Sequence, residues 1–183
     1  MESRAIGLVE LNSIARGVEC ADAMIKASDV ELIMARSTCP GRYLVMVAGD
    51  VGSVQNSVNV GKGVATEFLV DDFIIPNVHP SVFPALASST IIEMINALGI
   101  IETYSVASSI IAADGAVKAA DITLIEVRCA TGLAGKSYAS FTGDVGSVRS
   151  AMDAALGLIN DQGMIQCYAV IPSPAKDLHN SLV

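Results

Sequence analysis

The sequence predicts an α+β protein made of two consecutive domains, each with the ferredoxin-like order β-α-β-β-α-β. Three observations lead to this prediction. The sequence repeats itself once, each copy alternates short β-rich segments with Ala-rich segments of helical period, and 183 residues suffice for two domains of about 90 residues each. Each domain is therefore expected to be an antiparallel sheet with helices on one face.

The internal repeat is the strongest of the three observations. Ala5–Glu10 matches Ala97–Glu102 at a displacement of 92 residues, counted from Ala5 to Ala97. Gly49–Val54 recurs letter for letter as Gly143–Val148 at a displacement of 94, so the second copy holds two extra residues in a loop. Two copies are too few for a solenoid, and a duplicated domain is the simpler interpretation. The expected domains are residues 1–90 and 91–183.

In the first copy, β-rich patterns predict strands and helical periodicity predicts helices. The strands are expected at Ile6–Leu11, Val30–Arg36, Tyr43–Ala48 and Glu67–Ile75. The helices are expected at Ile14–Ala27 and Val51–Thr66, each after a residue that can cap it, Ser13 and Asp50. Pro76 ends the last strand.

The second copy predicts the same elements in the same order. Its strands are expected at Leu98–Thr103, Ile122–Arg128, Tyr138–Thr142 and Met164–Ile171. Its helices are expected at Val106–Ala119 and Val145–Asp161, with Ser105 and Asp144 as caps. Pro172 follows the last strand as Pro76 does in the first copy.

Composition excludes several classes of protein. The chain is 52% hydrophobic and 16% charged, which excludes a disordered chain. No apolar run approaches the roughly 18–20 residues that span a bilayer, and the first residues lack a signal-peptide core. The net charge is −8 without a Lys/Arg cluster, so we expect neither nucleic acid nor a membrane as a partner. A chain this apolar is expected to bury surface in an oligomer.

Four cysteines, Cys20, Cys39, Cys129 and Cys167, are expected to be reduced thiols. None belongs to a CxxC motif, which argues against a zinc site within one chain. Cys20, in a helix, and Cys167, in a strand, are expected to be small core residues. Cys39 lies in a Gly/Pro turn, where the commonest role is that of an ordinary exposed thiol. Cys129 precedes the corresponding loop of the second copy.

The repeated motifs resemble the bacterial microcompartment shell domain. That family opens with A-[ILM]-G-[LIM]-[IV]-E, continues with D-A-M-x-K-A-x-x-V and G-D-V-G-x-V, and closes with a strand ending in I-P. Both copies carry these features over nearly the whole chain. The duplication is similar to the tandem-domain, trimer-forming subclass, whose three chains are expected to form a flat pseudohexameric tile. The resemblance implies a shell protein, in the shell of a cytoplasmic compartment, with other shell proteins as partners and no enzymatic activity.

Thr38–Arg42 resembles the iron–sulfur-binding members of this subclass, from propanediol-utilisation microcompartments. The resemblance implies that Cys39 of three chains faces the pore and holds one [4Fe–4S] cluster per trimer. A three-fold axis can gather three copies of a single thiol, and clusters take three or four thiolates. Electron or cluster transfer across the shell is the implied role, with lumenal or cytosolic redox enzymes as possible partners. The implied pore loops are Thr38, Cys39, Pro40 and Gly41, and in the second copy Thr131, Gly132, Leu133, Ala134 and Gly135.

Lys26 and Lys118 occupy equivalent positions near the ends of matching helices. A cation there stabilises the end of a helix, and the family resemblance implies a second role, contact between tiles at their edges. Family members usually carry an Arg after the closing I-P, but this chain has Asn77 and Ser173, which implies weaker or mixed sheet formation.

Two further functions stay open at this point. One is a shell trimer whose pore holds no cluster and conducts small metabolites. The other, of a different class, is a regulatory protein that binds a small molecule between tandem ferredoxin-like domains. No catalytic triad, P-loop or dinucleotide motif is present in the sequence, so an enzyme ranks last.

Overall fold

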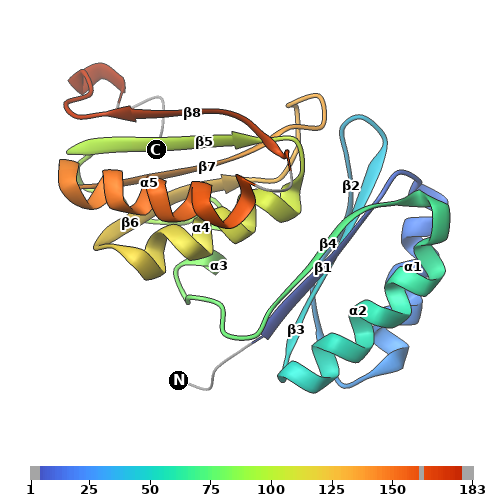
Figure 1. Ribbon diagram of the computed structural model, residues 1–183. Helices are drawn as coiled ribbons and strands as arrows, with labels where there is room; N and C mark the ends of the chain where they lie inside the picture. Colours follow the sequence, from blue (N-terminus) through green and yellow to red (C-terminus); the bar gives the residue numbers. More distant parts are fainter. Residues whose placement is uncertain (1–4, 161–162, 179–183) are drawn as a thin grey trace. The chain divides into compact units, whose positions relative to one another are not determined.

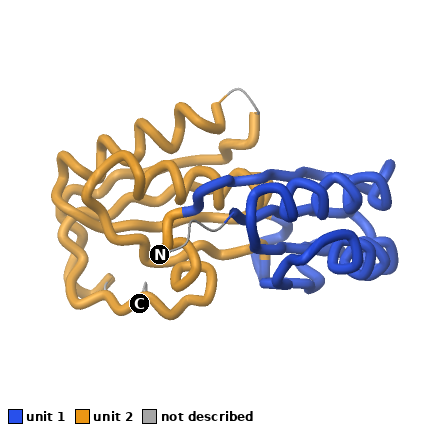
Figure 2. The backbone as a smooth tube through the Cα atoms, turned by 90° about the horizontal axis from the view of Figure 1, so that it is seen from below, with its two compact units in different colours: residues 1–78, 131–135 blue, residues 79–130, 136–183 orange. Residues whose placement is uncertain are grey.

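Two four-stranded antiparallel sheets, one from each half of the chain, organise the computed structural model, which describes residues 5–160 and 163–178 (Figure 1). Contacts divide the chain into two units. Unit 1 holds the described residues up to Val78 together with Thr131–Gly135, and unit 2 holds the remainder (Figure 2). No helix among the described residues is long and apolar enough to cross a membrane.

Unit 1 has the predicted order β-α-β-β-α-β. Its strands run in the sheet order β2-β3-β1-β4, and every neighbouring pair is antiparallel. Helices α1 and α2 cover one face of this sheet (Figure 1). The elements are β1 (Ala5–Leu11), α1 (Ile14–Ala27), β2 (Glu31–Thr38), β3 (Arg42–Gly49), α2 (Val51–Ala65), the 3-10 turn η1 (Thr66–Phe68) and β4 (Leu69–Ile75).

Unit 2 repeats this arrangement, with the sheet order β6-β7-β5-β8 and helices α4 and α5 on one face. A short helix, α3 (Val82–Leu86), precedes it. The other elements are β5 (Ala97–Thr103), α4 (Val106–Ala119), β6 (Ile122–Arg128), β7 (Ser137–Gly143), α5 (Val145–Ile159), β8 (Ile165–Ile171) and the 3-10 turn η3 (Lys176–Leu178). The predicted α+β fold class, with two ferredoxin-like domains, is therefore confirmed.

The four predicted helix caps are all formed. Ser13 and Ser105 accept hydrogen bonds from the backbone N–H groups of Arg16 and Ser108. Asp50 and Asp144 likewise accept from the N–H groups of Ser53 and Ser147. Hydrogen bonds from the Ser53 and Ser147 hydroxyls, followed by these N–H bonds, lower the pKa of the two carboxyls. Each carboxylate therefore stays charged where it satisfies a free helix donor.

Some boundaries differ from the predictions. The segment predicted as a strand from Glu67 begins with η1, and β4 starts only at Leu69. Helix α5 ends at Ile159, while Asp161, its predicted end, lies outside the described residues. The short elements α3 and η3 were not predicted, because three to five residues are too few to show a period.

Close packing at the sheet centre explains one glycine. Gly99 on β5 lies directly opposite Phe141 on β7, and a Cβ atom at Gly99 would overlap the aromatic ring. Phe141 is fully buried, so its ring has no free space into which to move. The glycine is therefore needed for the close approach of the ring rather than for a special backbone angle.

We expect Gly99→Ala to lower the free energy of unfolding by about 1–3 kcal/mol, because it overpacks this contact. Gly157→Ala is the matched control, since Gly157 lies in α5 and an added Cβ atom would meet nothing within 4 Å. It should raise the free energy of unfolding by up to about 1 kcal/mol through helix propensity. Chemical denaturation of both variants measures the difference, and equal midpoints would contradict the packing explanation.

Candidate functional site: the Cys39 turn and the β6–β7 loop

Cys39 lies at the tip of the hairpin that joins β2 to β3. The turn closes with a hydrogen bond of 2.9 Å from the Gly41 N–H to the Thr38 carbonyl, and Gly41 has a φ of +92°. Glycine adopts this left-handed conformation without strain, as the sequence predicted for the turn. Cys39, Pro40 and Gly41 are exposed. The thiol is thus held on a short turn in contact with solvent.

Thr38 differs from the rest of the turn. Its side chain is buried, with 7% exposure, and its Oγ1 has no hydrogen-bond partner among the described residues. A buried hydroxyl without a partner costs free energy. The turn therefore holds an unused donor next in sequence to the exposed thiol.

The β6–β7 loop is longer and has no exposed thiol. Thr131, Gly132 and Ala134 are exposed, Leu133 is half-buried and Gly135 is buried. Gly132, Ala134 and Gly135 all adopt positive φ angles. Thr131–Gly135 belongs to unit 1, where a Cβ atom on Gly135 would lie 2.8 Å from Pro40 Cδ. The two predicted loops therefore meet at Pro40 and Gly135.

A buried ion pair anchors the Cys39 turn. Arg42, directly after Gly41, donates to the Glu10 carboxylate at 2.6 Å. The Glu10 side chain is fully buried, at 0% exposure, and the Arg42 side chain is 22% exposed. Since a buried carboxylate must be paired, the pair fixes the start of β3 to the end of β1.

The second copy repeats this pair at the base of its own loop. Lys136, directly after Gly135, lies 2.5 Å from the Glu102 carboxylate. The two side chains are 38% and 33% exposed, so this pair is more solvated than the first. Neither pair was predicted from the sequence. The available signal was a Glu near the end of each copy of the first strand and a basic residue that follows each loop.

A second polar cluster lies on β6 and β7, beside the β6–β7 loop. The Glu126 carboxylate accepts hydrogen bonds from Tyr138 at 2.5 Å, from Arg128 at 2.9 Å and from Ser88 at 3.0 Å. Burial alone would raise the pKa of Glu126, but these bonds together lower it. Burial, followed by the Glu126 carboxylate, raises the pKa of Tyr138 to about 12. The cluster therefore stays a carboxylate with a neutral phenol and a guanidinium, an arrangement that stiffens this part of the sheet.

The other three thiols are placed differently. Cys20 is buried, as predicted, and burial, followed by the charge of Glu19, raises the pKa of its thiol to about 11. Cys129 is also buried, with its Sγ 3.8 Å from the Val127 carbonyl. The prediction that Cys167 is a core residue is wrong, because it is exposed on the edge strand β8. Two thiols per chain are therefore accessible, Cys39 and Cys167.

No three His, Cys, Asp or Glu side chains converge into a metal site within the described part of one chain. No such group of three forms around Cys39 within the described residues, so a cluster on this thiol would take its further ligands from other copies. Iron–sulfur clusters are held by thiolates, and an exposed thiol on an anchored turn is the chemistry such a ligand requires. The described residues thus fit a cluster shared between chains better than one held by a single chain.

The predicted edge lysines, Lys26 and Lys118, both pair with an Asp one helical turn earlier. Lys26 lies 2.7 Å from Asp22, and these side chains are 73% and 63% exposed. Lys118 lies 2.5 Å from Asp114, and here the exposed fractions are 38% and 9%. The two helix ends are therefore equivalent in sequence but not in exposure.

Arg42→Met should lower the free energy of unfolding by about 3 kcal/mol, because it removes the guanidinium that balances the buried Glu10 charge. Lys136→Met is the matched substitution at the more exposed pair and should have a smaller effect. Thermal unfolding at neutral pH compares them. A larger loss for Lys136→Met would contradict the assignment of Glu10 and Arg42 as the main anchor.

Comparisons with known proteins agree with this architecture. The BMC domain profile matches residues 5–78 and 97–174. The bacterial microcompartment shell protein PduT of Citrobacter freundii is 42% identical over 181 residues, covering 99% of this chain and 98% of that protein. The carboxysome assembly protein CcmO of a Synechococcus strain is 28% identical and covers 97% of this chain and 68% of its own length.

A solved structure extends the likeness to three dimensions. The crystal structure of a microcompartment protein from Desulfitobacterium hafniense DCB superimposes with a TM-score of 0.89 at 50% identity, covering 97% of this chain and 99% of that chain. The resemblance seen in the sequence motifs is thereby confirmed. The chain belongs to the family of bacterial microcompartment shell proteins, with two BMC domains in tandem.

Proposed function

We propose that three copies of this shell protein assemble into a pseudohexagonal tile of a microcompartment wall. Two domains of one topology in each chain supply six similar domains per trimer, which supports a closed ring with pseudo-six-fold symmetry. In this trimer the Cys39 turns and the β6–β7 loops alternate around a central pore. The meeting of Pro40 and Gly135 within one unit supports a common place for the two loops.

We further propose that Cys39 of three chains holds one [4Fe–4S] cluster in that pore. The observation that carries this proposal is an exposed thiol at the tip of an anchored hairpin in a chain with no metal site of its own among the described residues. Similarity to the shell protein PduT supports the tile.

The roles of the chain's own residues follow from this placement. Cys39 binds as a thiolate, and the Glu10–Arg42 pair keeps its turn in position. When bound, the cluster supplies one-electron chemistry, so the tile would pass electrons, or clusters, across the wall. The chain itself catalyses no reaction in this proposal.

The partners proposed are other shell proteins at the tile edges and redox enzymes on either side of the wall. Lys26 and Lys118 are the proposed edge contacts, and both keep exposed side chains beside an Asp. With Asn77 and Ser173 after the closing strands, these lysines carry most of the edge contact in this proposal.

Cys39→Ser should abolish the visible absorbance of an iron–sulfur cluster after anaerobic reconstitution with iron and sulfide. Cys167→Ser is the matched control, because it removes the other exposed thiol and should leave the cluster intact. Both variants should remain trimers, since the Cys39 turn is held by the Glu10–Arg42 pair rather than by the thiol. A cluster that survives in Cys39→Ser excludes Cys39 as a ligand. A wild-type trimer that takes up no iron favours a pore that conducts small metabolites.

The double variant Lys26→Ala with Lys118→Ala should lose the ability to form extended sheets or tubes while keeping its trimeric mass. Loss of two edge cations per chain removes contacts between tiles, and the buried Asp114 carboxylate keeps the hydrogen bond from the His79 N–H when Lys118 is replaced. Electron microscopy detects the sheets, and light scattering gives the mass. Sheets of normal extent would refute the edge assignment.

A further inference from the structure

The segments that follow the last strand of each domain contain the same turn. After β4 and Pro76, the Val82 N–H donates to the His79 carbonyl at 3.0 Å. After β8 and Pro172, the Leu178 N–H donates to the Ala175 carbonyl, also at 3.0 Å. Pro76 and Pro172 are 96 residues apart, and the same displacement separates His79 from Ala175 and Val82 from Leu178. The C-terminal turn thus repeats the turn that begins the connecting segment.

Within unit 2, the first of these turns is attached to helix α4. The His79 N–H donates to the Asp114 carboxylate at 2.8 Å, and Lys118 donates to the same carboxylate. Helix α3, which begins at Val82, packs against α4 and β6, and Val82 is fully buried. The connecting segment therefore covers this side of the second domain.

The matching side of unit 1 is bare. Asp22 corresponds to Asp114, but its side chain is 63% exposed instead of 9%. The apolar side chains around it differ in the same way. Ile14, Val18 and Leu32 on α1 and β2 are 48%, 53% and 41% exposed, whereas their counterparts Val106, Ile110 and Leu124 are all 0% exposed.

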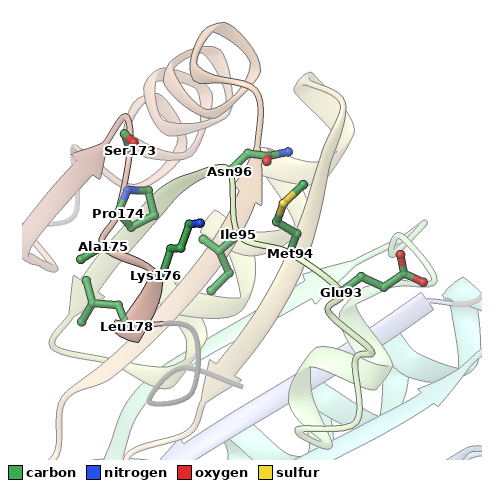
Figure 3. A pocket seen from close by; sticks show the side chains of 9 residues that line it. All are labelled: Glu93, Met94, Ile95, Asn96, Ser173, Pro174, Ala175, Lys176 and Leu178. Atoms are coloured by element: carbon green, nitrogen blue, oxygen red, sulfur yellow. The ribbon is translucent and has the colours of Figure 1, made fainter.

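The C-terminal turn is likewise unused in its own unit. Ala175 is exposed, and Leu178 is 40% exposed where its counterpart Val82 is buried. Ala175, Lys176 and Leu178 line a cavity of about 460 Å³ together with Met94–Asn96. Figure 3 shows these side chains, which come from the C-terminal segment and from the segment before β5. The C-terminal turn and the α1 face are therefore both uncovered. Their counterparts, the turn at His79 and helix α4, bind each other within unit 2.

We propose that the C-terminal segment Pro172–Leu178 of one copy docks on α1 and β2 of a second copy. The Ala175 N–H donates to the Asp22 carboxylate, as His79 does to Asp114, and Leu178 lies against the apolar side chains of Ile14 and Leu32. Lys118 remains 38% exposed although its partner Asp114 is covered. By the same geometry, Lys26 stays accessible at the tile edge when Asp22 is covered. This inference rests on the proposed trimer and names the contact that closes it.

An engineered disulfide tests the contact. Asp22→Cys with Ala175→Cys, in a chain that also carries Cys39→Ser and Cys167→Ser, should link chains covalently under mild oxidation. Denaturing electrophoresis should then show linked dimers and trimers that reducing agent removes. The matched control is His79→Cys with Asp114→Cys in the same background. It places thiols at the corresponding pair within one chain and should give an internal disulfide without linked chains.

The outcomes separate this contact from the tile itself. A protein that is trimeric by light scattering but gives no linked chains overturns the contact and leaves the trimer in place. A monomeric protein overturns both. Val18→Asp gives a second measure, because it places a charge on an exposed residue of the bare face and spares the domain core. It should weaken trimer formation at least about tenfold, and an unchanged dissociation midpoint on dilution would also overturn the proposal.

Discussion

Burying the Glu10 carboxylate requires a cation beside it, and this requirement ties the Cys39 turn to the centre of its sheet. β1 is an inner strand, and Arg42 begins β3 three residues after Cys39. A turn anchored by a 2.6 Å ion pair holds its tip in a fixed position. A residue that shares a ligand with other chains depends on such positioning, because its own chain supplies no pocket around the ligand. The Glu102–Lys136 pair shows that both copies kept this device while their loops diverged.

Duplication explains how the loops could diverge. Six identical domains around an axis would carry six identical loops, whereas a tandem chain allows two kinds to alternate. The interior changed in step with the loops. Gly17 packs against the Tyr43 ring in unit 1, and the corresponding residues of unit 2 are Ser109 and Ser137, both buried. A glycine packed against an aromatic ring in unit 1 thus corresponds to two buried serines in unit 2, so the packing beside each loop differs between the copies.

The sequence predicted the regular elements well, because period and capping are local properties. Ser13, Asp50, Ser105 and Asp144 each lie three residues from the donor they satisfy. The Glu10–Arg42 pair escaped prediction because its partners are 32 residues apart, and only the sheet register brings them together. Cys167 was misplaced for a related reason. Its strand is apolar enough for a core, but β8 lies at a sheet edge where most of its side chains are exposed.

Exposed apolar strands and an uncovered helix face are costly in an isolated chain. A head-to-tail contact between two different surfaces either closes into a ring or grows into a filament, and geometry decides which. In the proposed ring, the first helix of every domain is covered by the segment that follows the preceding domain. For unit 2 this segment belongs to the same chain, and for unit 1 it belongs to a neighbouring chain. Closure at three chains then also brings together three copies of Cys39. The contact that hides the α1 face and the symmetry that could hold a cluster are, in this proposal, consequences of one arrangement.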